Sequence, residues 1–184
     1  MVRPFLLTIL SSIILLPLLG CPPASLRVEK KEPIPIQVVN LESILEENEG
    51  LEIQEEDCKE ARDFYRGGVQ QKAKAEKHFQ ERNYFEALRF FRRSIDFLEK
   101  IIPLIPEDDA EYELFEGTGI LFFPNLLLAD NHLKVAKICQ IHGKRDESKR
   151  NLRKAKTFIE KSLRAEPTEW GLGIQSEIQA LLGQ

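Results

Sequence analysis

The side chains that most often carry enzymatic chemistry are few in this sequence. Its three histidines, His78, His132 and His142, belong to no HExxH motif, and no GxSxG elbow, phosphate-binding GxxxxGK[ST] loop or Cys/His cluster is present. A Gly-Thr-Gly at 117–119 lacks both a clear preceding strand and a third glycine, so it does not indicate a nucleotide site. Acidic residues lie in runs, which is typical of solvated surface. The sequence therefore predicts a non-catalytic protein without a metal or cofactor.

Cysteine is the remaining reactive residue type, and two of the three cysteines belong to no recognisable functional motif. Cys58 and Cys139 lie in no CxxC motif and are not near a histidine at metal-ligand spacing. Two interpretations stay open. They are small apolar residues on helical faces, or they form a disulfide, which an oxidising compartment would allow to persist.

A charged stretch late in the chain could recognise a partner. Residues 144–164 hold nine basic residues against three acids, a net charge of +6. This stretch is either a solvated helix face, or a strip for an acidic partner or anionic headgroups, or a surface onto which residues 42–60 fold back. Residues 42–60 hold nine acids against Lys59. The net charge of the whole chain is −4, which argues against nucleic acid as the partner.

The first 20 residues have the layout of a secretion signal. Arg3 provides a positive start, Phe5 to Leu19 is an apolar run, and Gly20 is a small residue at the expected cleavage site. A run of about 15 residues is too short to span a bilayer comfortably as a helix. We therefore expect residues 1–20 to be removed on export.

Leu18-Leu19-Gly20-Cys21 resembles the bacterial lipobox, because an apolar residue, a small residue and a cysteine follow one another in order. The resemblance implies that a diacylglycerol is attached to Cys21, that the chain is cut before this residue, and that the new amine is acylated. Such a lipoprotein is held in the membrane by two or three acyl chains. The Asp that favours inner-membrane retention in these families is replaced by Pro22, so we expect the periplasmic face of the outer membrane.

The mature chain is expected to begin with a tether and continue as helices. Prolines 22, 23, 33 and 35 favour extended backbone, so residues 21–54 are interpreted as a Pro- and Glu-rich tether and 55–184 as the helical domain. Apolar residues at helical spacing predict five helices, with a candidate break at 67–68, a glycine stop at Gly143 and Asp146 as an N-cap. The expected ranges are 55–81, 84–102, 125–142, 146–164 and 168–182. The apolar run 120–123 is expected to close the core, with an exposed contact patch as the alternative.

The two longest predicted helix pairs are related by an offset of 61 residues, which aligns Ala75 with Ala136, Ala87 with Ser148 and Phe91 with Leu152. Residues 83–95 resemble the second helix of a tetratricopeptide repeat, and 143–155 resemble it more loosely. The repeat of that family is 34 residues, so the offset requires an insertion of about 27 residues near 99–125. The resemblance implies an all-α fold of antiparallel helical hairpins, stacked as a short solenoid behind the signal and tether.

Together these features predict a membrane-anchored envelope lipoprotein that acts as a non-catalytic protein–protein interaction module. Its partner would be an envelope protein or a peptide segment of one, and pairing with a second copy of the chain is a further alternative. A fixed assembly or pilot subunit of an outer-membrane secretion, pilus or barrel-assembly machine is the rival hypothesis, and a lipoprotein enzyme is disfavoured. The residues expected to contact the partner are Asn83, Arg89, Arg92, Arg93, Lys149, Arg150 and Arg153.

Overall fold

Every secondary-structure element of the described region is helical. The structure, a computed structural model, describes residues 59–104, 119 and 122–183. It contains five α-helices, one short 3-10 helix and, within these residues, no strand, which confirms the all-α class. The α-helices are α2 (Lys59–Gln80), α3 (Tyr84–Glu99), α5 (Phe123–Ile141), α6 (Arg145–Ala165) and α7 (Glu169–Leu182), and the 3-10 helix is η2 (Ile102–Leu104).

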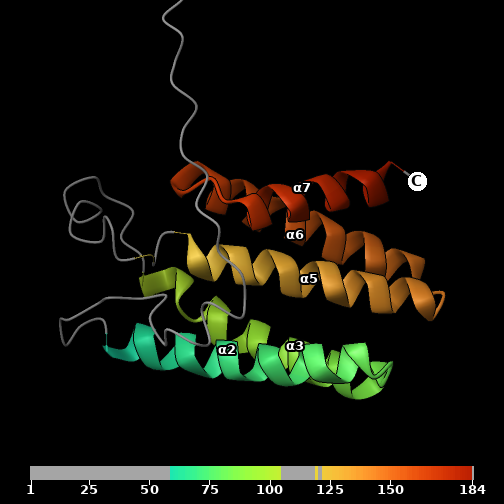
Figure 1. Ribbon diagram of the computed structural model, residues 1–184, viewed down its shortest axis with the longest axis horizontal. Helices are drawn as coiled ribbons and strands as arrows, with labels where there is room; N and C mark the ends of the chain where they lie inside the picture. The colour runs from blue at the N-terminus through green and yellow to red at the C-terminus, as the bar shows by residue number, and fades with distance from the viewer. Residues whose placement is uncertain (1–58, 105–118, 120–121, 184) are drawn as a thin grey trace, which may run out of the picture. The chain divides into compact units, whose positions relative to one another are not determined.

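The helices form two antiparallel hairpins and a covering helix. α3 packs along α2 and α6 packs along α5, while α5 also contacts α3 and so joins the hairpins. α7 packs on α6 and touches α5, as Figure 1 shows. The hairpins are therefore as the periodicity predicts. The described helices all lie in one compact unit of the chain, and none of them is long and apolar enough to cross a membrane.

Both hairpins turn in the same way, at positions separated by the offset of the internal repeat. In the first turn, the N–H of Asn83 donates to the carbonyl of His78, and Arg82 has a positive φ of 58°. In the second, the N–H of Lys144 donates to the carbonyl of Cys139, and Gly143 has a φ of 72°. These bonds close a Schellman motif in each hairpin. The sequence offset thus corresponds to a repeated backbone geometry, and the predicted stop at Gly143 is confirmed.

Short side chains lie where the helices of each hairpin cross. Ala75, Ala87 and Ala136 are completely buried, and Ser148 is 1% exposed. Large side chains such as Phe91 and Leu152 fill the adjoining space in two apolar clusters. Because small residues let two helix backbones approach, this arrangement explains why the apolar stripes are interrupted by alanine and serine. Phe122 is buried and Phe123 packs against both clusters, so this part of the 120–123 run closes the core.

Three local predictions were wrong. The glycines at 67–68 do not break α2, which continues through them. Their role is in packing, since they leave room for Phe97 and Leu98 of α3: a Cβ on Gly68 would lie 2.7 Å from the Leu98 side chain. α3 ends at Glu99 rather than residue 102, and a 3-10 turn containing Pro103 follows. Asp146 lies inside the first turn of α6, since the Schellman turn starts that helix directly and leaves Lys144 at the N-cap position.

The signal at 1–20, Cys21, the tether at 21–54 and Cys58 lie outside the described residues. Cys139 is a free thiol, buried in the core, and its burial raises its pKa.

Candidate functional site

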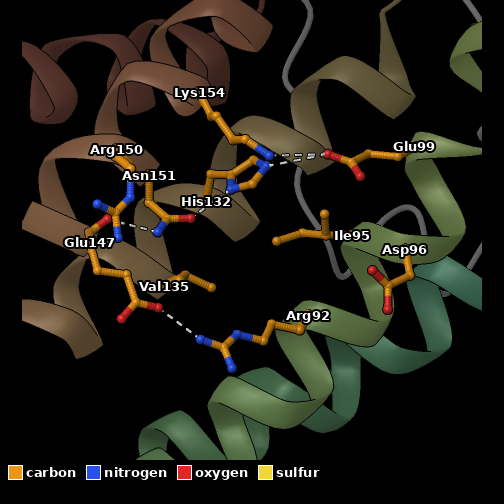
Figure 2. A pocket seen from close by; sticks show the side chains of 10 residues that line it. All are labelled: Arg92, Ile95, Asp96, Glu99, His132, Val135, Glu147, Arg150, Asn151 and Lys154. Carbon is orange, nitrogen blue, oxygen red and sulfur yellow. Dashed lines mark hydrogen bonds and ion pairs between the residues drawn. The ribbon is translucent and has the colours of Figure 1, made fainter.

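A groove with a volume of about 460 Å³ opens between α3, α5 and α6. Figure 2 shows that α3 and α6 form its two sides and that α5 contributes His132 and Val135 between them. On α3 and on α6 the lining residues lie three, four and seven positions after the first one, and the two on α5 are three apart, which places each set on one helical face. They are Arg92, Ile95, Asp96 and Glu99 of α3, His132 and Val135 of α5, and Glu147, Arg150, Asn151 and Lys154 of α6.

Ion pairs between α3 and α6 cross both ends of the groove. At one end, the Arg92 guanidinium lies 2.8 Å from the Glu147 carboxylate. At the other, Lys154 Nζ lies 3.7 Å from Glu99 Oε1. Ile95 and Val135 point toward one another in the middle, and both are less than 10% exposed. The groove therefore offers an apolar floor between two charged ends. Because the pairs are partly exposed, each contributes little to stability and can be exchanged for a ligand's charges at small cost.

His132 is the buried polar group of the groove, only 3% exposed, and its hydrogen bond with Asn151 fixes its tautomer. Asn151 Nδ2 donates to the carbonyl of Glu147, so Asn151 Oδ1 is the atom that lies 2.9 Å from His132 Nδ1. An amide oxygen only accepts, and Nδ1 must therefore carry the proton. Phe158 stacks on the ring, with centroids 5.7 Å apart.

The other ring nitrogen of His132 is left as an acceptor without a donor. Nε2 is buried and has no hydrogen-bond partner, and the nearest carboxylate oxygen, of Glu99, is 4.0 Å away. Burial lowers the pKa of His132 to about 4, so the ring is neutral near pH 7. A neutral imidazole facing a carboxylate presents two acceptors, which do not satisfy one another. A ligand N–H or O–H entering the groove could supply the missing donor.

Two further groove residues lack a partner of opposite charge within the described part of the chain. Arg150 of α6 and Asp96 of α3 are exposed, and neither has an ion pair or hydrogen bond there. The groove can thus bind a segment that brings its own carboxylate to the α6 side.

Two of the seven residues expected to contact the partner line this groove, namely Arg92 and Arg150. Lys149 and Arg153 are exposed on α6 outside the groove, and Asn83 is exposed in the first turn. Arg89 and Arg93 lie over the Phe90 ring, at 4.8 and 5.8 Å from its centroid. The structure therefore separates the arginines of α3, with only Arg92 turned toward α6.

Sequence reasoning missed most of the groove. Glu147, Asn151 and Lys154 recur at helical spacing, as do Arg92, Asp96 and Glu99, and this signal could have marked a polar stripe on each helix. It could not show that the two stripes face one another. His132 falls within the predicted helix 125–142, and its burial and its bond to Asn151 show that it is a hydrogen-bonded core residue.

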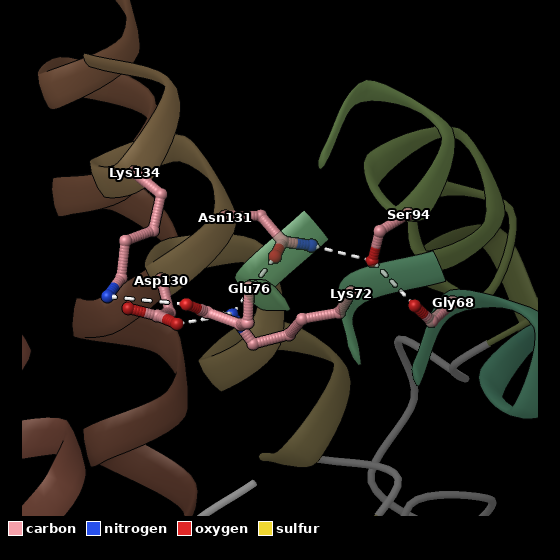
Figure 3. A network of polar contacts seen from close by, with 7 residues as sticks. All are labelled: Gly68, Lys72, Glu76, Ser94, Asp130, Asn131 and Lys134. Atoms are coloured by element: carbon pink, nitrogen blue, oxygen red, sulfur yellow. Dashed lines mark hydrogen bonds and ion pairs between the residues drawn. The ribbon is translucent and has the colours of Figure 1, made fainter. Parts of the chain in front are cut away.

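A second polar cluster joins the hairpins, and it is internally satisfied (Figure 3). The Lys72 side chain on α2 is completely buried and forms an ion pair with Asp130 of α5. Its Nζ also lies 3.1 Å from Glu76 and 3.2 Å from Asn131. Although burial works against both charges, the pKa of Lys72 is raised by Asp130 and Glu76, and that of Asp130 is lowered by Lys72. All its charges face partners, so this cluster is structural.

The cluster continues into α3 through neutral hydrogen bonds. Asn131 Nδ2 donates to Ser94 Oγ at 2.8 Å, and Ser94 Oγ donates to the carbonyl of Gly68 at 2.7 Å. Three helices are thereby tied together at one level. Within residues 59–104, 119 and 122–183, no group of three or more His, Cys, Asp or Glu side chains is arranged to hold a metal ion.

Comparison of the chain with protein-family models, curated proteins and solved structures gave no match.

Proposed function

We propose that this protein is a membrane-anchored, non-catalytic interaction module of the bacterial envelope, and that the groove between α3, α5 and α6 binds a segment of a partner protein. The two hairpins act as a short tetratricopeptide-like solenoid, and acyl chains on Cys21 hold the domain at the periplasmic face of the outer membrane. The single observation that carries the proposal is the groove itself, with Ile95 and Val135 between two ion pairs and an unsatisfied acceptor at His132 Nε2. A donor-bearing segment with an apolar side chain fits those features.

Photo-cross-linking in intact cells tests the partner site. Asp96→p-benzoylphenylalanine places a cross-linker in the groove at an exposed position. Gln179→p-benzoylphenylalanine places it on the exposed side of α7 as the matched control. We expect capture of envelope proteins at the first position only. One stoichiometric partner would indicate an assembly subunit, and many substoichiometric ones a peptide receptor. Equal capture at both positions would contradict the groove as the site.

Two charge-reversal variants test whether the partner binds in the groove or elsewhere on the cationic surface. Arg150→Glu reverses a groove charge that has no partner among the described residues, and we expect capture at position 96 to fall about tenfold. Arg93→Glu reverses an exposed charge outside the groove and should leave capture within about twofold. If Arg93→Glu lowered capture and Arg150→Glu did not, the partner would bind on the side of α3 that carries Phe90 and not in the groove.

The anchor is tested separately. Cys21→Ala should abolish incorporation of labelled palmitate and release the protein from the membrane fraction. Retention of label in this variant would rule out Cys21 as the acylated residue.

A further inference from the structure

Helix α6 has two unlike faces. Its buried face carries short and apolar side chains that pack in the core with residues of α5 and α7, among them Leu152, Ala155 and Ile159. Its solvent face carries a row of charged residues that follow one another at steps of three or four positions, which keeps them on one side of the helix. The row consists of Arg145, Lys149, Arg153, Lys156, Glu160 and Arg164, and all six are exposed. Its five basic members are called the cationic stripe below.

The cationic stripe is poorly neutralised by the protein. Glu160 is the one acid in its row, and its carboxylate lies 3.8 Å from Lys156 Nζ. The other four members form no ion pair with any residue that the structure describes. Over its whole length α6 holds eight bases against three acids, whereas the groove lining holds three of each. Charge therefore selects an anionic partner at the stripe and not in the groove.

The chemistry of the stripe fits lipid headgroups better than a protein. Stable protein interfaces are built around buried apolar or aromatic anchors. The exposed large apolar residues of the described chain all lie outside α6: Phe85, Leu104, Ile141, Leu172 and Leu182. A headgroup layer needs no such anchor, because each lysine or arginine near an anionic leaflet adds to the attraction by its charge alone. From Arg145 to Arg164 the stripe is about 29 Å long, so its members can meet a flat surface together.

We propose that the cationic stripe of α6 lies on the anionic phospholipid headgroups of the bilayer that holds the acyl anchor, and so fixes the orientation of the helical domain on the membrane. The ammonium and guanidinium groups of the stripe contact headgroup phosphates, while the apolar face of α6 stays in the protein core. The groove remains open to a partner, because its α6 lining contains no member of the stripe. This proposal rests on the proposed function only for the acyl anchor that brings the domain to the bilayer.

A fluorescent reporter beside the stripe measures this contact in the full chain, purified from membranes and reconstituted in vesicles. Thr157→p-acetylphenylalanine, coupled to a fluorophore through its ketone, places the reporter at an exposed position of α6. Gln70→p-acetylphenylalanine places the same reporter at an exposed position of α2, in the other hairpin, as the matched control. The vesicles contain phosphatidylcholine and a lipid with a nitroxide on its headgroup, with or without about 30% phosphatidylglycerol.

We expect phosphatidylglycerol to raise nitroxide quenching at position 157 about fivefold and to change quenching at position 70 by less than about twofold. The physical reason is that only the stripe is drawn to the anionic headgroups. Quenching at position 157 that does not depend on phosphatidylglycerol, or an equal rise at both positions, would overturn the proposal.

Charge neutralisation provides a matched pair of variants. Replacing Lys149, Arg153, Lys156 and Arg164 by glutamine should reduce the phosphatidylglycerol effect at position 157 about fivefold, since their attractions add. Replacing Lys74, Lys77, Arg89 and Arg93 by glutamine removes as many exposed cations from the first hairpin and should leave the effect within about twofold. Equal effects of the two sets would mean that only net charge matters, and would refute the stripe as the contact. Circular dichroism checks that both variants keep their helices.

Salt provides an independent check on the electrostatic origin of the contact. Raising its concentration from about 50 to about 500 mM should reduce the phosphatidylglycerol effect at position 157 about threefold, because exposed charges are screened. An effect that does not change with salt would contradict attraction by the stripe.

An acidic protein is the competing occupant, and cross-linking in intact cells separates it from lipid. With Thr157→p-benzoylphenylalanine we expect phospholipid adducts, detected as a mass increase of the α6 peptide. Capture of a single protein in place of lipid would overturn the proposal and assign the stripe to a protein partner.

The same measurements distinguish failure of this inference from failure of the proposed function. If the chain incorporates palmitate and floats with the vesicles, but phosphatidylglycerol has no effect at position 157, the anchor survives and the headgroup contact fails. If no palmitate is incorporated, but phosphatidylglycerol still raises quenching at position 157 when the chain is added to preformed vesicles, the headgroup contact survives and the proposed anchor fails.

Discussion

Removing the buried ammonium of Lys72 should destabilise the protein more than any surface change. Lys72→Met keeps a side chain of similar length but leaves Asp130, which is 4% exposed, without its main counter-charge. Breaking a buried ion pair on one side costs about 3–5 kcal/mol. We expect the lower end, about 3 kcal/mol, because Lys134 and Lys137 also lower the pKa of Asp130 and remain in place. The free energy of unfolding of a domain is about 5–15 kcal/mol, so this loss would remove a large share of the stability.

Urea unfolding followed by circular dichroism measures this loss, with Lys77→Met as the control because Lys77 is exposed on the same helix. The control should stay within about 0.5 kcal/mol of wild type. Lys72→Met combined with Asp130→Leu removes both charges and should recover about 2 kcal/mol of the loss, since no buried charge is then stranded. A single variant within about 1 kcal/mol of wild type, or a double variant no more stable than the single, would refute the reasoning.

Three further predictions concern pH and packing. The lowered pKa of Asp130 means that its contribution is present at neutral pH and is lost as pH falls below about 4, so acid unfolding monitored by circular dichroism should shift to lower pH in the double variant. His132 behaves differently: its pKa falls to about 4 on folding, so the unfolded state binds the proton first, and stability should decrease by about 3 kcal/mol between pH 6.5 and 4. His132→Phe should flatten that interval, and an unchanged slope would exclude His132 as its source. Gly68→Ala places a Cβ 2.7 Å from Leu98 and should cost about 1–3 kcal/mol, whereas Gly173→Ala, with nothing within 4 Å, should gain about 0.5–1 kcal/mol in the same urea assay.

Much of the fold could be predicted because apolar residues recur at helical spacing along each helix. The 61-residue offset aligned Ala87 with Ser148 and Phe91 with Leu152, and all four side chains are buried in the structure. Helix ends were predicted less well. A proline or a glycine marks where a helix can stop, while hydrogen bonds such as that from Lys144 to Cys139 decide where the next one starts.

The groove and the buried cluster could not be predicted from the sequence for a different reason. Lys72 and Asp130 are 58 residues apart, and nothing local to either residue indicates burial. The same holds for Arg92 and Glu147, which are 55 residues apart. A charged residue on a helix is normally solvated, so only the packing of one hairpin on the other reveals which charges meet. The sequence therefore predicts which face of each helix is apolar, but it does not predict which faces pack against one another.

The contact of Lys72 with Asp130 also bears on whether the hairpins are separable units. In many repeat proteins each unit contributes its own increment of stability, and arrays can be shortened or extended with little harm. Here the Lys72 ammonium is on α2 and its counter-ion, the Asp130 carboxylate, is on α5. Either hairpin expressed alone would therefore lose the partner of a charge that is buried in the intact protein. We therefore expect the two hairpins to fold and unfold in one cooperative step, and a cut in the connection between them to yield two fragments that associate rather than two independent domains.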